Sequence, residues 1–206
     1  YGNTTTVGDD AGEYPSSVGF VDFDAGVIQI AAGGFHTCVL LATGEVRCWG
    51  NGANGRLGYG NTNNIGDDEL PGDAGIVSVG GPIVQIVTGN QHTCALLATG
   101  KMRCWGMGSS WRLGYGNTDD VGDLPTRLPS DAGEVSVGGD VAWLAAGNEH
   151  TCAVLATGTV KCWGMGSYGV LGYGNTNFLA SPEANVPVGS EVVQISAGID
   201  HTCALL

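Results

Sequence analysis

The sequence predicts an all-β fold made of β-propeller blades, each with four antiparallel strands. Three observations predict it: short motifs recur in fixed order with a period of about 57 residues, glycine is abundant, and the apolar segments are short and rich in β-branched residues. Along the chain His-Thr-Cys, Cys-Trp-Gly and Tyr-Gly-Asn-Thr follow one another in that order, and the sequence ends before a fourth Cys-Trp-Gly. At this period the chain amounts to about three and a half blades of a larger array.

The strands of a unit can be placed in order along the sequence. An apolar, β-branched run between glycines predicts a buried first strand, at residues 27–32, 83–87, 141–146 and 192–197. A second strand over 36–41 and a third over 45–50 are joined by a three-residue loop, in which Gly44 supplies the positive φ. A Val-Ser-Val alternation predicts a short fourth strand at 76–79 and 134–137. We therefore expect repeats at 1–58, 59–114, 115–172 and 173–206, the last incomplete.

Charge and hydropathy exclude several classes of function. Acidic residues outnumber basic ones by 20 to 7, which gives a formal net charge of -13. A surface of that sign repels phosphate backbones, so we expect no nucleic-acid ligand. The apolar runs are far shorter than the roughly 18 residues of a membrane span, so we expect no span. Because the sequence has neither an initiator Met nor a signal-type segment near Tyr1, we expect it to be a piece of a longer protein.

The cysteines can be paired by counting outward from the hairpin loop. Residues that face each other across two antiparallel strands lie about 4.5 to 5.5 Å apart, which a disulfide can span. The count predicts three disulfides, Cys38 with Cys48, Cys94 with Cys104 and Cys152 with Cys162. Regular pairing of this kind predicts an oxidising compartment, extracellular or at the cell surface. Two alternatives remain: buried, reduced thiols, or a zinc site formed with the histidine of the same unit, for which no fourth ligand is evident.

Cys203 is the odd cysteine. It lies at the His-Thr-Cys position of the fourth unit, and the sequence stops before the strand that would carry its partner. We expect the partner outside this chain, in further units of a longer array. Head-to-tail association of identical chains is a second explanation, because such contacts build rings or filaments.

These motifs carry a family resemblance. Gly-x-x-His-Thr-Cys-(Ala/Val)-Leu-Leu, Gly-x-Val-x-Cys-Trp-Gly-x-Gly and Gly-x-Leu-Gly resemble the repeat of the regulator of chromosome condensation family over nearly the whole chain. The resemblance implies a propeller, usually of seven blades, and the cysteines resemble the secreted bacterial branch. The founding member acts on a small GTPase and on chromatin, but this chain is acidic and lacks a basic tail, so we expect neither role. A secreted relative inhibits β-lactamases through its face loops, which suggests protein binding as a general mode.

The positions that differ between units are the candidates for binding. In the loop after Cys-Trp-Gly the flanking residues are the same in each unit, while the residues at the tip of the loop differ. Trp, Tyr and Arg at such a position are side chains that anchor protein interfaces. The contact candidates are Asn54, Arg56, Trp111, Arg112 and Tyr168. The alternative is that Trp111 and Tyr168 pack against the neighbouring blade.

The residues that recur in every unit are interpreted as structural. We expect the histidines to hold the turn before the second strand by a hydrogen bond, and Trp49, Trp105 and Trp163 to fill the core between blades. The sequence has no Ser-His-Asp motif, phosphate loop or nucleophile elbow. We therefore predict that the chain is not an enzyme and needs no cofactor.

Acidic turns follow the Tyr-Gly-Asn-Thr motif. Carboxylates and loop carbonyls are the ligands that calcium prefers, and the candidates are Asp9, Asp10, Asp67 and Asp68. A solvated turn is the alternative, since the spacing matches no known calcium loop. The sequence thus predicts a non-catalytic extracellular or cell-surface module that recognises a protein or glycan through its variable loops. The alternative function is a structural repeat unit of a surface assembly or filament, built from further copies of itself.

Overall fold

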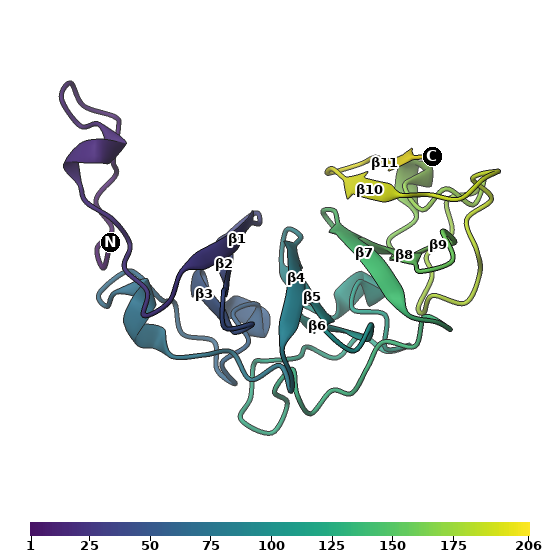
Figure 1. Ribbon diagram of the computed structural model, residues 1–206, viewed down its shortest axis with the longest axis horizontal. Helices are drawn as coiled ribbons and strands as arrows, with labels where there is room; N and C mark the ends of the chain where they lie inside the picture. The colour runs from purple at the N-terminus through teal and green to yellow at the C-terminus, as the bar shows by residue number, and fades with distance from the viewer.

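The computed structural model describes residues 1–206, apart from the side chain of Pro15, and shows small antiparallel sheets that follow one another along an arc (Figure 1). The first sheet contains β1 (Val27–Ala32), β2 (His36–Leu41) and β3 (Val46–Gly50). The second contains β4 (Ile83–Thr88), β5 (His92–Leu97) and β6 (Met102–Gly106), and the third β7 (Val141–Ala146), β8 (His150–Leu155) and β9 (Val160–Gly164). The fourth contains β10 (Gln194–Ala197) and β11 (Thr202–Leu205).

The connections between strands contain short 3-10 helices. These are η1 (Pro15–Ser17), η2 (Ala53–Gly55), η3 (Pro71–Ala74), η4 (Ser109–Trp111) and η5 (Ser167–Gly169). Within the described part of the chain, the structure has no helix that is both long and apolar enough to cross a bilayer. In Figure 1 the N-terminal segment, coloured purple, stands away from the arc, and β1, β4, β7 and β10 line the concave side.

The hairpin between the second and third strands has the predicted register. The Leu41 N–H donates to the Glu45 carbonyl (2.9 Å) across a loop in which Gly44 has a φ of 82°. The half-cystines therefore face each other, and disulfides join Cys38 to Cys48, Cys94 to Cys104 and Cys152 to Cys162. Since these sulfurs are bonded to one another, they form neither reduced thiols nor a zinc site. Cys203 is exposed and free.

The expected fourth strand is an extended segment that makes a single backbone hydrogen bond to the third strand. The donors and acceptors are Val77 N–H and Val46 O (2.9 Å), Val135 N–H and Met102 O (3.0 Å), and Val186 N–H and Val160 O (2.8 Å). In the first of these segments, Gly75 and Gly80 have positive φ and turn the chain away on either side, so no ladder forms. The first three sheets therefore have three hydrogen-bonded strands, with the extended segment beside the outer one.

The Leu-Gly-Tyr motif closes each complete unit. The Tyr59 hydroxyl accepts a hydrogen bond from the Cys48 N–H (3.0 Å) and donates one to the Cys48 carbonyl (3.1 Å). Burial raises the pKa of Tyr59 to about 12. Gly58 makes room for the next unit, because a Cβ there would lie 2.8 Å from Nε1 of Trp105. Trp105 and Trp163 are fully buried, as predicted for core residues, whereas Trp49 is half-buried.

A hydrogen bond from histidine to threonine joins each sheet to the next one. The imidazole Nε2 and threonine Oγ1 pairs are His36 and Thr93 (2.7 Å), His92 and Thr151 (3.0 Å), and His150 and Thr202 (2.9 Å). The sequence predicts a bond that holds a turn within one unit. The structure directs it to the following unit, because this face of the second strand packs against the neighbouring sheet.

Glutamine side chains make a second link between sheets. The Gln29 amide donates to the Ile86 carbonyl (2.8 Å), and its Oε1 accepts from the Ile86 N–H (2.9 Å). Gln85 makes the same two bonds to Leu144, at 3.2 and 2.9 Å. The innermost strand of a sheet has one edge without a β-partner, so these amides satisfy peptide groups that would otherwise face the concave side.

Candidate functional site

Equivalent loops follow the third strand of the first three sheets, and their tips have the same unusual backbone. Asn54, Ser110 and Tyr168 occupy one position, and each lies in the left-handed region with φ between 58° and 60°. The next residue is also left-handed, and it is Gly55 in the first loop and Gly169 in the third. In the second loop this residue is Trp111, with a φ of 57°. A bulky aromatic therefore stands where the other units have glycine.

The backbone of Trp111 is unfavourable on its own. A left-handed conformation costs a non-glycine residue about 1 to 2 kcal/mol. The indole ring packs edge-on against Phe178, with ring centroids 6.1 Å apart. An aromatic pair of this geometry contributes about 0.5 to 1.5 kcal/mol beyond the area it buries. The contact with Phe178 therefore offsets much of the strain and holds the indole in one place.

The first loop uses polar contacts at the positions where the later loops place aromatic rings. The Asn54 amide donates to Asp120 of the next unit (3.0 Å). Asp120 in turn accepts from the Gly108 N–H (2.8 Å), as Asn64 accepts from the Gly52 N–H (3.1 Å). In the third unit the residue at this position is Phe178, which cannot accept such a bond. Its contact with the preceding loop is therefore aromatic, through Trp111, and because Phe178 is 43% exposed it also leaves an apolar surface.

The structure gives the five predicted contact residues different surroundings. Tyr168 is 80% exposed at the tip of its loop, and Trp111 and Asn54 are half-buried. Arg56 and Arg112 are only 4% and 1% exposed. Phe178 was not among the predicted contact residues. An alignment of the units shows it, because the equivalent residues Asn64 and Asp120 are polar.

The two buried arginines stabilise the loops from below. Arg56 Nε donates to the Ala53 carbonyl (2.8 Å), and its guanidinium lies over the ring of Phe35 at 5.4 Å. Arg112 Nε donates to the Ser109 carbonyl (2.8 Å), and its guanidinium pairs with Glu149 at 3.3 Å. Burial lowers the pKa of both side chains. Because both arginines are buried and contact the loop itself, we interpret them as stabilising the loop and not as contacting a ligand.

The predicted calcium ligands form one small cluster and a separate pair. The carboxylates of Asp67 and Asp68 lie with that of Glu69 within 4.8 Å of one another, mostly in solvent. The protonated Glu69 carboxyl donates a hydrogen bond to the neighbouring Asp68 carboxylate, and this bond raises the pKa of Glu69. Asp9 and Asp10 are exposed and lie in the N-terminal segment. Exposed acidic turns are common without a metal, so calcium binding stays a prediction.

Successive sheets on an arc, joined by loops that keep their frame and vary at their tips, define a β-propeller protein. The chain belongs to the regulator of chromosome condensation family. A family model described as "Regulator of chromosome condensation (RCC1) repeat" matches residues 43–96 and 100–154, and a second model of the same description matches 27–56, 83–110 and 144–170. The resemblance and the all-β propeller fold expected from the sequence are confirmed.

Curated relatives extend well beyond this chain. It is 33% identical over 182 residues to the human E3 ubiquitin-protein ligase HERC2, covering 87% of this chain and 4% of that protein. It is 34% identical over 179 residues to the ultraviolet-B receptor UVR8 of Arabidopsis thaliana, covering 86% of this chain and 38% of the receptor. The chain thus spans less than half the length of these relatives.

Solved structures of similar shape include a yeast protein and the ectodomain of a plant receptor kinase. Prp20p from Saccharomyces cerevisiae superposes with a TM-score of 0.69 at 20% identity, over 86% of this chain and 43% of that one. The ectodomain of the Arabidopsis thaliana receptor kinase ACR4 gives a TM-score of 0.52 at 20% identity, over 87% and 51% of the respective chains. At such identities the likeness concerns the fold alone.

Proposed function

We propose that this chain is a non-catalytic protein-binding module that works outside the cytosol and holds its partner on the loops that follow the second and third sheets. The observation that carries the proposal is the exchange of polar for aromatic residues at equivalent positions of one rigid scaffold. Tyr168 stands where the first unit has Asn54, and Phe178 stands where it has Asn64. Exposed Tyr and Trp side chains supply much of the binding energy in protein interfaces.

The rigidity of this region supports the proposal. Trp111 is fixed by its contact with Phe178, and the loop beneath it is held by the buried Arg112. The hydroxyl of Ser110 also donates to Glu149 of the following sheet (2.8 Å). A preorganised aromatic surface loses little conformational entropy on binding, which favours affinity.

The uses of similar propellers agree with protein binding. The yeast structures that resemble this chain are described by their binding of Gsp1p and histones in one case and of Kap60 in the other. Gsp1p, histones and Kap60 are partners of the yeast protein, and we do not assign them to this chain. What we carry over is the mode of action, in which a propeller presents loops to another protein.

The disulfides support a location outside the cytosol. Three of them recur at the same place in successive units, and such bonds persist in oxidising compartments. The propeller of ACR4 is part of an ectodomain, so this fold also occurs on a cell surface. These observations support our proposal of an extracellular or cell-surface setting.

An exchange of loop residues tests the proposal. Trp111→Gly, Tyr168→Asn and Phe178→Asn together give the loops after the second and third sheets the residues of the first unit, which the scaffold already accommodates. Wild-type protein used as bait on secreted and surface proteins of its source should recover a partner that the triple variant loses. The purified partner is then titrated against both, and Asn54→Ser serves as the control. Equal affinity of wild type and triple variant for that partner would refute the loop site.

A further inference from the structure

An apolar patch marks the junction between the second and third units. Gly164 and Leu179 form an antiparallel pair through two backbone hydrogen bonds, of 2.8 and 3.0 Å. This register places Met165 opposite Phe178, and the ring of Phe178 contacts Trp111. Trp111, Met165 and Phe178, here named the junction patch, therefore lie together at the surface, where Phe178 is 43% exposed.

The junction between the first and second units lacks this patch. Its equivalent residues are Gly55, Met107 and Asp120, so only the methionine is shared. Trp111 also keeps its left-handed backbone at a position that favours glycine. Methionine and aromatic side chains are enriched in protein interfaces, and strained backbone clusters at functional sites. The exchange therefore points to a contact that the second and third units make and the first unit does not.

A following unit does not cover the position of Phe178. Asp120 occupies that position in the second unit, which is followed by the whole third sheet. Its carboxylate accepts from Gly108 of its own unit (2.8 Å) and from Asn54 of the preceding one (3.0 Å). Among the described residues it bonds to none of the third unit. The patch is therefore a surface of the assembled repeats and does not depend on how many units there are.

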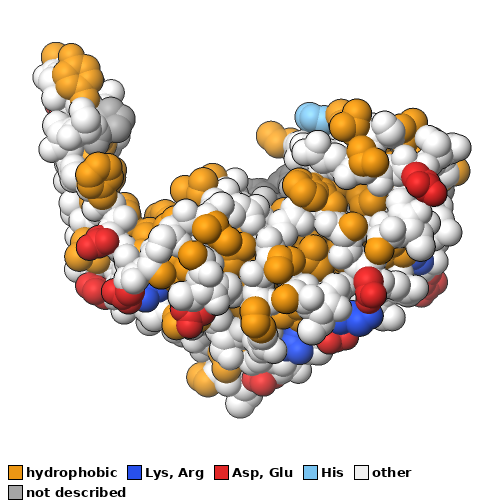
Figure 2. Space-filling view, viewed as in Figure 1, with side chains coloured by type: hydrophobic (Ala, Val, Ile, Leu, Met, Phe, Trp, Pro, Cys, Tyr) orange, Lys and Arg blue, Asp and Glu red, His pale blue; other side chains and the backbone are white. Residues whose placement is uncertain are grey.

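The basic side chains are all engaged within the molecule, whereas most acidic ones are not. Each of the 7 basic side chains donates to a carboxylate or to a backbone carbonyl of the chain. Of the 20 acidic side chains, four pair with a cation among the described residues. Figure 2 shows few Lys and Arg atoms, most of them close to Asp or Glu atoms. A surface of this sign attracts cationic partners and repels anionic ones.

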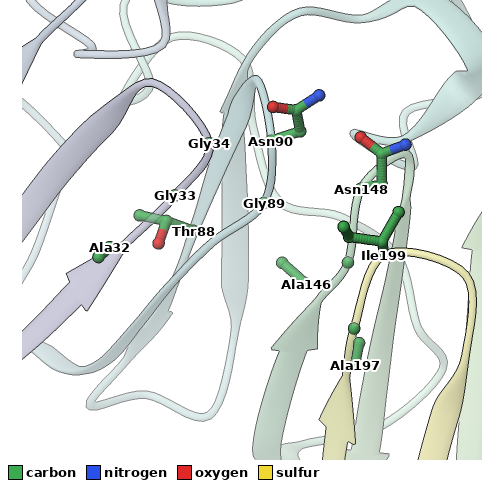
Figure 3. Close-up of a pocket in the computed structure, with 12 residues that line it drawn as sticks. Ala32, Gly33, Gly34, Thr88, Gly89, Asn90, Ala146, Asn148, Ala197 and Ile199 are labelled. Atoms are coloured by element: carbon green, nitrogen blue, oxygen red, sulfur yellow. The ribbon is translucent and has the colours of Figure 1, made fainter.

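Glu149 borders the patch from the turn between β7 and β8. It follows Asn148, which Figure 3 shows on that turn. Its backbone carbonyl accepts from the Met165 N–H (2.9 Å). The Ser110 hydroxyl (2.8 Å) and the Arg112 guanidinium (3.3 Å) both contact its Oε2 atom, so Oε1 has no partner among the described residues. Since its side chain is 27% exposed, that oxygen can receive a cation from outside.

Asp119 adds a second carboxylate beside the loop of Trp111. A Cβ on Gly108, where this loop begins, would lie 2.0 Å from the Asp119 carbonyl oxygen, so the two backbones are in contact. The Asp119 side chain is exposed, and no bond to its carboxylate occurs among the described residues. The equivalent residues of the neighbouring units are Asn63 and Asn177, so this charge also departs from the repeat.

We propose that the junction patch holds a basic segment of the protein partner, whose lysine or arginine side chains pack on the patch and pair with Glu149 and Asp119. This assignment rests on the proposed function and names the chemistry of the partner. The alkyl stem of such a side chain buries apolar surface while its charged end reaches a carboxylate, and a cation near an indole face gains further energy. An acidic segment would be repelled, and an apolar one would leave the carboxylates dehydrated without a cation.

Selection from a phage-displayed library of random dodecapeptides tests this assignment. The whole chain is the bait, and the double variant Trp111→Gly, Phe178→Asn removes peptides that bind elsewhere. We expect the retained peptides to carry a net positive charge, with lysine or arginine beside an aliphatic or aromatic residue. Retained peptides that are neutral or acidic, or a failure to retain any, would overturn the basic segment.

Calorimetric titration of one selected peptide, made synthetically, separates charge from apolar contact. Asp119→Asn restores the residue of the neighbouring units and should weaken binding about two- to fivefold. Glu45→Gln is the control, because it removes one charge from the hairpin loop between β2 and β3, at the opposite end of the strands, and should leave the affinity unchanged. Raising NaCl from about 0.05 to about 0.5 M should weaken wild-type binding about tenfold. An affinity unchanged by Asp119→Asn, or one that does not fall with salt, overturns the ion pairs.

The loop site and its preference for positive charge can fail separately. Peptides that need Trp111 and Phe178 but carry no positive charge leave the protein-binding loops in place and overturn only the basic segment. A partner that the triple variant holds as well as the wild type refutes the loop site itself. Melting temperatures of the double variant and of Asp119→Asn close to that of the wild type confirm that each result reports binding and not unfolding.

Discussion

His92 and Thr151 form a hydrogen bond of 3.0 Å between the second and third sheets, and both side chains are completely buried. The Thr151 hydroxyl donates to the Arg112 carbonyl (2.8 Å), so it accepts from the imidazole. An imidazole buried in this way is stable only when neutral, and burial lowers the pKa of His92 well below its ordinary value. The junctions between sheets therefore depend on protonation.

Acid should weaken the protein through these junctions. Burial lowers the pKa of His36 and of His150 to about 4, from an ordinary value of 6.5. Folding favours the neutral imidazoles, so their contribution is complete above about pH 6.5 and is lost as the pH falls towards 4. Each histidine contributes on the order of 3 kcal/mol across this range. Denaturant unfolding between pH 7.5 and 4 measures the loss.

A neutral replacement isolates the histidine effect from that of the carboxylates. In His36→Gln the amide can still donate to Thr93, and it does not titrate. The free energy of unfolding of this variant should fall less steeply between pH 6.5 and 4 than that of the wild type. Identical slopes would show that His36 does not carry the acid sensitivity.

Each disulfide should add stability to its hairpin. The bridge between Cys94 and Cys104 closes a loop with a sequence separation of 10, which in the chain-entropy model is worth about 2.7 kcal/mol. Replacing both cysteines with serine should lower the free energy of unfolding by about that amount. Cys203→Ser is the control, because that thiol is exposed and free, and it should change nothing. Intact mass before and after reduction should differ by three pairs of hydrogen atoms.

Truncation of two tryptophans should change the unfolding free energy by very different amounts. Trp111→Gly relieves the left-handed strain and loses the Phe178 contact, so the net change in unfolding free energy should stay within about 1 kcal/mol. Trp105→Ala empties a fully buried site and should cost about 3 to 5 kcal/mol. Thermal melts of the two variants give the comparison. A large loss for Trp111→Gly would mean that the indole is a core residue.

The tyrosine of the Leu-Gly-Tyr motif should matter through its hydroxyl. Tyr115 exchanges two hydrogen bonds of 3.1 Å with the backbone of Cys104. Tyr115→Phe leaves those buried peptide groups without a partner and should cost about 1 to 3 kcal/mol. Tyr168→Phe removes a hydroxyl from an exposed side chain and should be neutral. Equal effects of the two variants on urea unfolding would contradict this assignment.

The hairpins could be predicted from sequence because their interactions are local. The loop at Gly44 fixes the register, and the register sets Cys38 against Cys48. The destination of each histidine could not be predicted in this way, because the Thr93 hydroxyl that meets His36 lies 57 residues further along the chain. The burial of Arg56 and Arg112 was missed for the same reason. Trp143 differs from these residues, because an alignment of the units shows a tryptophan where the other units have glutamine.

The junction from histidine to threonine also bears on how such a chain can evolve. Each unit has a histidine that can bond to the following unit and a threonine that can accept from the preceding one. Any two units can therefore form this hydrogen bond without a further substitution. Duplication or deletion of a whole unit by recombination would then leave all remaining junctions chemically intact. The number of repeats can change by one at a time, while a single substitution, such as the one at Trp143, makes one unit different from the others.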